Sequence, residues 1–200
     1  YFNSDKMRLY LFDFDGTISN SDSMFAFLKT IYSIPIFYLL IIKAIPIFIK
    51  YKLKIINKHE FKESFLLIFL SRFSKPRLEE YANKFAENYN KNIKKSAIKL
   101  IEDLKKDKSN EITIVSASLD IWIKPIAKKI GINYISTESK FRDTLFAGIK
   151  GQNCWGKNKV LRVKNIYDVQ DFEEVYAFGD SSGDLEMLKF ATQSKYKFFN

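Results

Sequence analysis

The sequence predicts an α/β fold: a Rossmann-like, doubly wound parallel sheet into which an all-helical domain is inserted. An apolar run at residues 9–12 ends in turn-forming residues, as a strand does. Residues 111–199 alternate between short β-branched or apolar runs and helical periods. Residues 20–107 show helical periods and no alternating strand pattern. We therefore expect a core of residues 1–18 and 108–200, interrupted by a helical insert at 19–107.

The first strand carries the most informative motif of the chain. Leu9, Leu11 and Phe12 favour a buried strand, and the sequence DFDGT follows at once. Asp13 and Asp15 therefore lie at the C-terminal tip of a strand, where open α/β sheets bind ligands. Two carboxylates this close repel each other unless a cation or a shared proton neutralises them.

The insert is predicted to contain helices near residues 24–31, 61–73, 77–90 and 92–106. Residues 31–49 form an apolar run close to the length of a membrane span, interrupted by Pro35, Lys43 and Pro46. A single span is disfavoured because both ends of the insert must return to one sheet. A buried helix and an apolar, basic surface at a membrane interface remain as alternatives.

The second half of the chain is expected to supply the rest of the sheet. Helix 122–130 should end at Gly131, and a hairpin is expected within 141–152 around Gly148 and Gly151. The other predicted elements are strands at 111–115, 133–136, 175–178 and 196–199, and helices at 157–165 and 184–190.

Composition narrows the class of protein. The 200 residues are 46% hydrophobic and 28% charged, which is typical of a globular protein. Cys154 is the one cysteine, so an intramolecular disulfide is impossible and a reducing, cytoplasmic location is expected, with membrane association as an open alternative. The polar residues 1–8 predict no signal peptide. The net charge of +10 is concentrated in residues 19–107, with 17 Lys and Arg against 9 Asp and Glu, but nothing beyond charge favours a nucleic-acid partner.

Three more polar groups follow predicted strands or open helices. Ser116 comes directly after the run 112–115, and Lys157 follows Gly156. Asp180 follows the run 176–178, with Asp184 four residues further on. Converging carboxylates, a hydroxyl and an ammonium group are suited to phosphoryl transfer with a hard divalent cation. The simpler alternatives are helix caps for Ser116 and Asp184, and a surface lysine for Lys157, with Lys159 close by.

DFDGT, Ser116, Lys157 and the sequence GDSSGD at 179–184 resemble, in order, the four motifs of the haloacid dehalogenase (HAD) superfamily. An insert after the first motif is similar to the helical C1-type cap of the phosphoserine-phosphatase-like branch, subfamily IB. The resemblance implies a HAD-type phosphoric monoester hydrolase, with Asp13 as nucleophile and Asp15 as general acid/base. It also implies that Mg²⁺ binds the Asp13 and Asp180 carboxylates and the Asp15 backbone carbonyl. The remaining implied roles are phosphate binding by Ser116, Ala117 and Lys157, with support from Thr17 and Asp184.

The substrate is less well defined than the reaction. Phosphoserine phosphatases carry a cap arginine and a glutamate that bind the substrate, whereas this chain has no arginine in the insert before Arg72 and has Asp22 at the position of the glutamate. The expected substrate is a small phosphomonoester. One alternative is a phospholipid head group, because the apolar insert with basic flanks resembles the caps of C-type phosphatidylglycerophosphatases. The others are a non-catalytic module that docks on membranes or partners, and a receiver-type domain, against which the large insert and Asp15 argue. The oligomeric state stays open.

Overall fold

The computed structural model describes residues 7–199, so the first residues of the predicted segment 1–18, and residue 200, lie outside it. A six-stranded sheet forms the centre of the molecule, in the order β4-β3-β2-β1-β5-β6. All neighbouring strands are parallel except the β3–β4 hairpin. The strands are β1 (Met7–Phe12), β2 (Asn110–Leu119), β3 (Asn133–Arg142), β4 (Leu145–Lys150), β5 (Phe172–Gly179) and β6 (Gln193–Tyr196).

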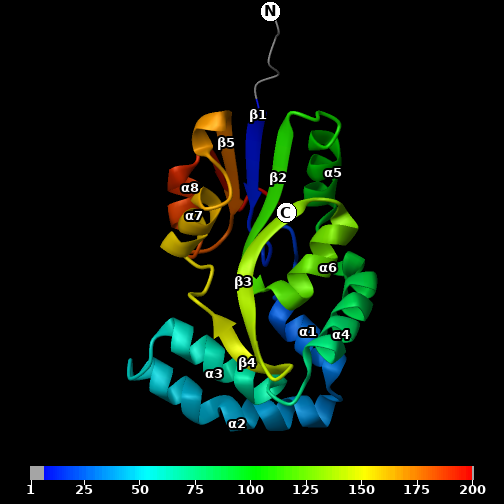
Figure 1. Ribbon diagram of the computed structural model, residues 1–200, viewed down its shortest axis with the longest axis vertical. Helices are drawn as coiled ribbons and strands as arrows, with labels where there is room; N and C mark the ends of the chain where they lie inside the picture. The colour runs from blue at the N-terminus through cyan, green and yellow to red at the C-terminus, as the bar shows by residue number, and fades with distance from the viewer. Residues whose placement is uncertain (1–6, 200) are drawn as a thin grey trace, which may run out of the picture.

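Helices cover both faces of the sheet, and a helical insertion follows β1 (Figure 1). The fold is therefore the predicted Rossmann-like α/β architecture with a helical insertion. The insertion holds α1 (Ser23–Ile31), α2 (Ile34–Lys52), α3 (Lys58–Leu70), α4 (Lys75–Asn88) and α5 (Lys95–Leu104), with the 3₁₀ turn η1 (Tyr89–Asn92) between the last two. Between and after the later strands lie α6 (Asp120–Ile130), α7 (Lys157–Lys164), η2 (Val169–Asp171) and α8 (Leu185–Phe190).

The alternation of side chains along β1 divides the core in two. Leu9 and Leu11 point to one face, where they join a cluster with Val163 of α7 and Met187 of α8. Tyr10 and Phe12 belong to the larger cluster on the other face, which includes residues of α4, α5 and α6. Because successive side chains of a strand point to opposite faces, a strand apolar at every position must be buried on both sides. This burial fixes β1 at the centre of the sheet.

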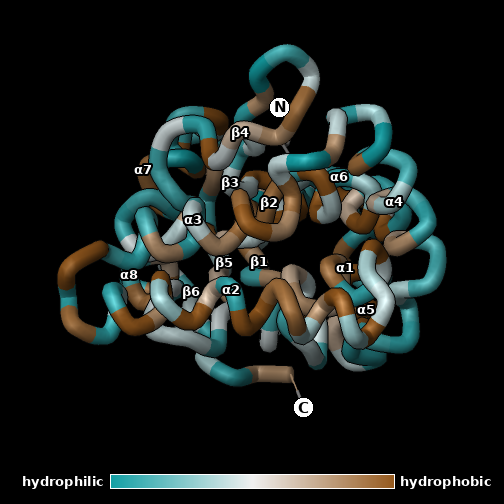
Figure 2. The backbone as a smooth tube through the Cα atoms, turned by 90° about the horizontal axis from the view of Figure 1, so that it is seen from below, coloured by the Kyte–Doolittle hydropathy of each residue, from teal (hydrophilic) through white to brown (hydrophobic). Residues whose placement is uncertain are grey.

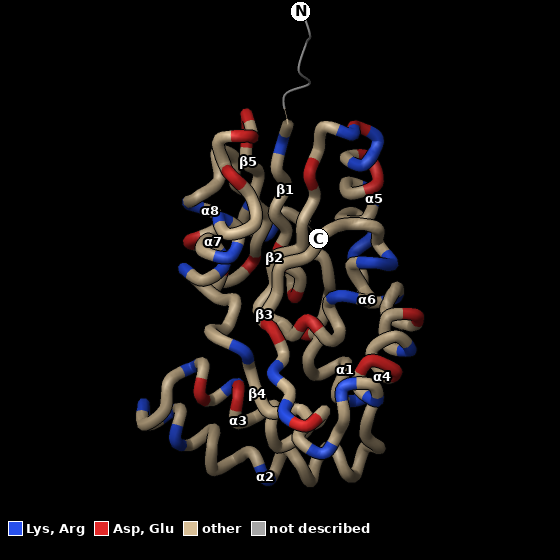
Figure 3. The backbone as a smooth tube through the Cα atoms, viewed as in Figure 1, with Lys and Arg blue, Asp and Glu red and all other residues tan. Residues whose placement is uncertain are grey.

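Helix α2 does not match the expectation of a buried helix. It lies at one end of the molecule and packs against α3. Figure 2 views the molecule from that end and shows that most of α2 is hydrophobic. Only Phe37 and Ala44 of α2 are buried. Figure 3 shows lysines along α2 and no acidic residue. The buried-helix alternative is therefore wrong for most of its surface.

Two local predictions are corrected. The β3–β4 hairpin turns at Asp143 and Thr144, which take positive φ angles of 47° and 72°, while Gly148 lies inside β4. Two consecutive left-handed residues suit the twist of a tight hairpin, and aspartate tolerates that conformation. The last strand is Gln193–Tyr196 rather than 196–199. Gly131 ends α6 at a φ of 76°, as predicted.

Candidate active site

The carboxyl ends of β1, β2 and β5 meet at one edge of the sheet. Phe12 pairs with both Ile114 and Phe178 in the two neighbouring parallel ladders. The backbone N–H of Asp13 continues the ladder by donating to the carbonyl of Phe178 at 2.9 Å. Asp13 and Asp180 each follow directly after their strands, so the register brings both to the same edge, as the sequence predicted.

Lys159 is the cation at the centre of this edge. Its Nζ donates to Asp13 Oδ1 at 2.5 Å, to Asp184 Oδ1 at 2.6 Å and to the carbonyl of Val115 at 2.6 Å. The side chain is 1% exposed. Burial lowers the pKa of Lys159, but the charges of Asp13 and Asp184 outweigh that effect and leave the pKa raised. Lys159 is therefore a buried, permanently charged bridge between two carboxylates.

Lys157 does not occupy the position expected of it. It is the first residue of α7 and is exposed, whereas Lys159 is buried two residues later. The inner face of α7 carries Lys159 and Val163, four residues apart, as the helical period requires. The lysine that reaches the aspartates is thus Lys159, and the prediction of Lys157 is corrected.

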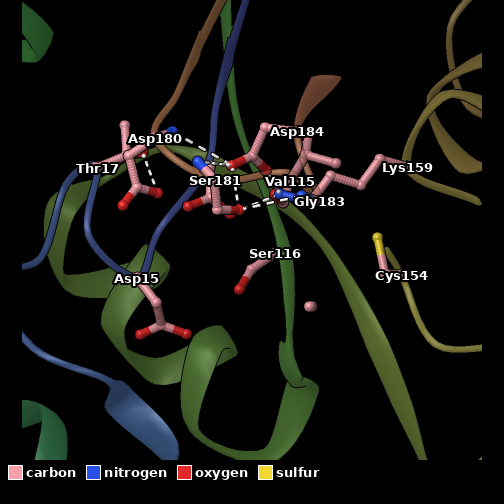
Figure 4. A network of polar contacts seen from close by, with 12 residues as sticks. Asp15, Thr17, Val115, Ser116, Cys154, Lys159, Asp180, Ser181, Gly183 and Asp184 are labelled. Carbon is pink, nitrogen blue, oxygen red and sulfur yellow. Dashed lines mark hydrogen bonds and ion pairs between the residues drawn. The ribbon is translucent and has the colours of Figure 1, made fainter. Parts of the chain in front are cut away.

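Asp184 connects α8 to the site. Its Oδ2 accepts hydrogen bonds from Ser181 Oγ at 2.8 Å, from the Ser181 N–H at 3.0 Å and from the Asp180 N–H at 3.2 Å. Burial would raise its pKa, but Lys159 and Ser181 together hold the pKa below the usual range. Asp184 therefore stays ionised, and it orients Lys159 in addition to preceding α8 as its N-cap residue. Figure 4 shows Asp184 between Lys159 and the Asp180–Ser181 segment.

The turn after β1 approaches Asp180 closely. Gly16 has a φ of +87°, and a Cβ at this position would lie 2.1 Å from Asp180 Oδ2. Thr17 Oγ1 donates to Asp180 Oδ1 at 3.4 Å, which places Thr17 beside that carboxylate. The geometry of the turn thus depends on the absence of a side chain at residue 16.

The aspartates fit a hard divalent cation. One oxygen from each of Asp13, Asp180 and Asp184 lies within 4.8 Å of the others. Burial raises the pKa of Asp13 to about 7, against the lowering effect of Lys159. Lys159 takes Oδ1 of Asp13, so Oδ2 and the Asp180 carboxylate are the oxygens best placed for a cation. Oxygen donors of this kind are those that Mg²⁺ prefers, and its charge would favour ionisation of Asp13.

Asp15 points away from this cluster and is held by a separate chain of hydrogen bonds. Its Oδ1 accepts from the backbone N–H of Ser23 at 2.7 Å, and its Oδ2 accepts from Ser118 Oγ at 2.6 Å. Ser118 Oγ lies 3.0 Å from Ser23 Oγ, which accepts from Trp122 Nε1 at 3.0 Å. Because indole can only donate and each hydroxyl has one proton, the chain runs from Trp122 through Ser23 and Ser118 to Asp15. Burial raises the pKa of Asp15.

Ser116 and Ala117 lie at the end of β2 between these two groups. Ser116 is buried, and its Oγ accepts from the Ser118 N–H at 3.0 Å. The carbonyl of Ala117 accepts from Thr137 Oγ1 at 2.7 Å and from Lys62 Nζ. Figure 4 places the Ser116 side chain between Asp15 and the Asp180–Asp184 network. Phosphate binding by Ser116 and Ala117 remains a prediction from the resemblance.

Lys62 is a residue of the site that is absent from the sequence-based predictions. It extends from α3 of the insertion and donates to the Ala117 carbonyl and to Asn153 Oδ1 at 2.9 Å. Burial lowers its pKa to about 8. One sequence signal could have found it: Lys62 is a basic residue within the apolar period of helix 58–70. Lys62 therefore joins the insertion to the edge of the sheet.

The chain is similar to known proteins over nearly its whole length. Residues 10–189 match the family of haloacid dehalogenase-like hydrolases. Protein CicA of Caulobacter vibrioides (strain NA1000 / CB15N) is 30% identical over 194 residues, which cover 96% of this chain and 86% of that protein. The match spans both the sheet and the helical insertion.

Solved structures share the fold. A protein with unknown function from Bordetella pertussis Tohama I superposes with a TM-score of 0.79 at 22% identity, covering 94% of this chain and 89% of that one. A phosphoserine phosphatase with a phospho-aspartyl intermediate analogue gives a TM-score of 0.61 at 21% identity, covering 95% and 86%. At these identities the likeness supports the architecture, including the insertion after β1.

Proposed function

The chain belongs to the haloacid dehalogenase-like hydrolases, and we propose that it is a Mg²⁺-dependent phosphatase that hydrolyses a phosphomonoester through an aspartyl-phosphate on Asp13. The observation that supports this proposal is that two neighbouring carboxylates have different surroundings. Asp13 lies in the cluster with Lys159 and Asp184, and Asp15 lies outside it in its own hydrogen-bond chain. One carboxylate is thus suited to attack phosphorus, and the other is suited to carry a proton.

In the first step, an oxygen of Asp13 attacks the phosphorus, the bond from phosphorus to the ester oxygen breaks, and the leaving oxygen takes a proton from Asp15. Burial raises the pKa of Asp15, which favours the protonated carboxyl that this step needs. In the second step, water attacks the aspartyl-phosphate, Asp15 takes its proton, and the bond from phosphorus to the Asp13 oxygen breaks. Inorganic phosphate and the free Asp13 carboxylate result.

The remaining groups of the site would stabilise the negative charge of the carboxylates and of the phosphoryl oxygens. Mg²⁺, held by Asp13 and Asp180 with Asp184 nearby, would supply positive charge for the phosphoryl oxygens. Lys159 holds Asp13 in place and offsets the charge of Asp184. Ser116 and the Ala117 backbone are assigned to the phosphate oxygens. Buried titratable clusters gather at functional sites, so Lys159 held between two carboxylates supports an enzyme over a module that only docks on a partner.

Turnover of a panel of soluble phosphomonoesters, with Mg²⁺ or with a chelator, tests the proposal. The wild type should release phosphate only with Mg²⁺, and Asp13→Asn should lower kcat by at least about 10³-fold because an amide is a poor nucleophile. Asp143→Asn, at the exposed hairpin turn, is the matched control and should retain full activity. An active Asp13→Asn protein would overturn the assignment of the nucleophile.

A further inference from the structure

Helix α2 exposes an apolar face to solvent. The helix is long and apolar enough to cross a membrane, yet only 11% of its most apolar window is buried. Exposed large hydrophobic side chains are unusually dense here, and Ile34 and Ile42 are 74% and 61% exposed. The others on α2 are Ile36, Tyr38, Leu39, Ile45, Phe48 and Ile49. A patch of this kind is typical of a surface that contacts an apolar partner.

The helical period explains how α2 can be apolar on two sides. Phe37, Ile41 and Ala44 recur at intervals of three or four residues and turn towards the protein, where Phe37 packs on Phe69 of α3 with ring centroids 5.8 Å apart. Leu39, Ile42, Pro46 and Ile49 recur at the same intervals on the opposite side and are exposed. An ordinary surface helix would carry polar residues on that side. We call this exposed side, with Tyr38 and Ile45, the α2 face.

Positive charge surrounds the α2 face. The segment 23–59 contains lysines at six positions and no Asp or Glu. Lys43 and Lys50 follow one edge of the face by the helical period, and Lys52 lies near the other. After the helix, Leu53 and Ile55 are each 66% exposed. Apolar side chains bordered by lysines match the two layers of a membrane interface, acyl chains beneath and anionic head groups beside them.

We propose that the α2 face docks on the surface of an anionic phospholipid bilayer, with α2 lying in the plane of the interface. Charge complementarity favours this occupant over a second copy of the chain, because two α2 faces in contact would bring lysines together without acidic partners. The inner side of α2 is packed on α3, where the rings of Tyr51 and Phe61 stack with their centroids 4.9 Å apart. The helix can therefore dock without leaving the protein.

This inference depends on α2 and does not depend on the chemistry proposed at Asp13. Docking would hold the enzyme at a membrane surface whether its phosphomonoester is soluble or carried by a lipid. The two proposals can therefore fail separately, and the variants below lie outside the candidate active site.

Cosedimentation of the full chain with vesicles tests the proposal. We expect binding to vesicles of phosphatidylcholine with phosphatidylglycerol, weak binding to phosphatidylcholine alone, and weaker binding as salt rises. Leu39→Gln/Ile42→Gln should weaken binding to the anionic vesicles by at least about tenfold through lost apolar contact. Lys50→Glu/Lys52→Glu should weaken it by at least about tenfold through reversed charge.

Matched controls carry the same changes elsewhere. Leu161 and Ile166, on α7 and directly after it, are 56% and 59% exposed, and α7 lies apart from α2 in Figure 1, so Leu161→Gln/Ile166→Gln should bind as the wild type does. Lys124→Glu/Lys128→Glu on exposed positions of α6 should lose less than half as much affinity as the α2 charge variant. Thermal unfolding of each variant shows whether it is folded, and analytical sedimentation gives its oligomeric state.

The outcomes separate clearly. Anionic binding that both α2 variants lose and the controls retain supports the proposal. A wild-type protein that does not bind anionic vesicles would overturn it. Equal losses of binding in the α2 variants and in the controls would overturn it as well. A dimer that Leu39→Gln/Ile42→Gln converts to a monomer, without vesicle binding, would assign the α2 face to a second copy instead. Phosphatase activity on a soluble ester should be the same in the α2 variants, and Asp13→Asn should still bind vesicles.

Discussion

Lys159 Nζ and Asp13 Oδ1 lie 2.5 Å apart in a site where both side chains are almost fully buried. Asp184 completes the group from the other side at 2.6 Å. Removing the ammonium would leave two buried carboxylates without a positive charge to pair with, and breaking a buried ion pair in this way costs about 3–5 kcal/mol. The position of Asp13 therefore depends on Lys159.

Lys159→Met should lower kcat by at least about 10²-fold and lower the unfolding midpoint, because it removes this charge from a buried cluster. Lys157→Met is the matched control, the same substitution on an exposed residue of the same helix. Phosphate release and thermal unfolding measure both effects. An active Lys159→Met protein together with an inactive Lys157→Met protein would show that Lys157, and not Lys159, is the lysine needed for activity.

Ser118→Ala should lower kcat by about tenfold while leaving Mg²⁺ dependence unchanged, because the hydroxyl orients Asp15 and does not contact the aspartate cluster. The control is Ser136→Ala. Ser136 Oγ is buried without a hydrogen-bond partner among the described residues, so its removal should leave kcat unchanged and stability equal or higher. Steady-state kinetics across pH compare the two variants. Equal kcat in wild type and Ser118→Ala would show that the hydrogen-bond chain is not needed for proton transfer.

Gly16→Ala should raise the Mg²⁺ concentration for half-maximal turnover by about tenfold or more, because the new methyl group would displace the Asp180 carboxylate. Gly151→Ala separates this effect from backbone strain. Gly151 has a φ of +70°, but a Cβ there meets no atom within 4 Å. Both variants should lose roughly 1 kcal/mol of stability from the left-handed backbone. A normal Mg²⁺ titration for Gly16→Ala would contradict the close approach.

Lys62 should make stability rise with pH in the alkaline range. Its pKa is lowered from 10.5 to about 8 in the folded protein because burial disfavours the charged form. Between these two values the unfolded chain binds more protons than the folded one, so the free energy of unfolding increases with pH, by up to about 1.4 kcal/mol per pH unit. Below pH 8 this contribution is absent.

Urea unfolding at a series of pH values tests this dependence. In Lys62→Met the increase between about pH 8 and 10.5 should be flatter than in the wild type. Lys157→Met should keep the wild-type slope, since Lys157 is exposed. Identical curves for wild type and Lys62→Met would mean that Lys62 titrates as a solvated lysine.

The sequence predicted what depends on strand ends and could not predict what depends on the rotation of a helix. Asp13 and Asp180 followed from apolar runs that end in turns, and the parallel register brought them together. The start of α7 at Lys157 was predicted, but the choice between Lys157 and Lys159 required knowing which side of the helix faces the sheet. Two residues apart on a helix, one side chain points to the sheet and the other to solvent. The position of Lys62 within the apolar period of helix 58–70 could indicate an inward side chain, but no local pattern shows that this side of the helix packs on the sheet.

The same distinction applies to α2. Its apolar run predicted a helix, but an apolar helix can be buried, interfacial or spanning, and hydropathy is the same in all three cases. Only the packing of α3 against one side shows that the other side is exposed. Similarly, the hairpin was expected, but its turn formed at Asp143 and Thr144 because the strand continues through Gly148.

The most direct test of the proposed chemistry is to trap the phosphorylated enzyme. The wild type and Asp15→Asn proteins would be mixed with an aryl phosphate, whose leaving group needs little help from a proton donor, then quenched in acid and mapped by peptide mass spectrometry. We expect a phosphoryl group on Asp13, accumulating in Asp15→Asn because hydrolysis of the intermediate has lost its base. Phosphate release without any phosphoryl group on Asp13 in either protein, or a phosphoryl group on another residue, would contradict the account.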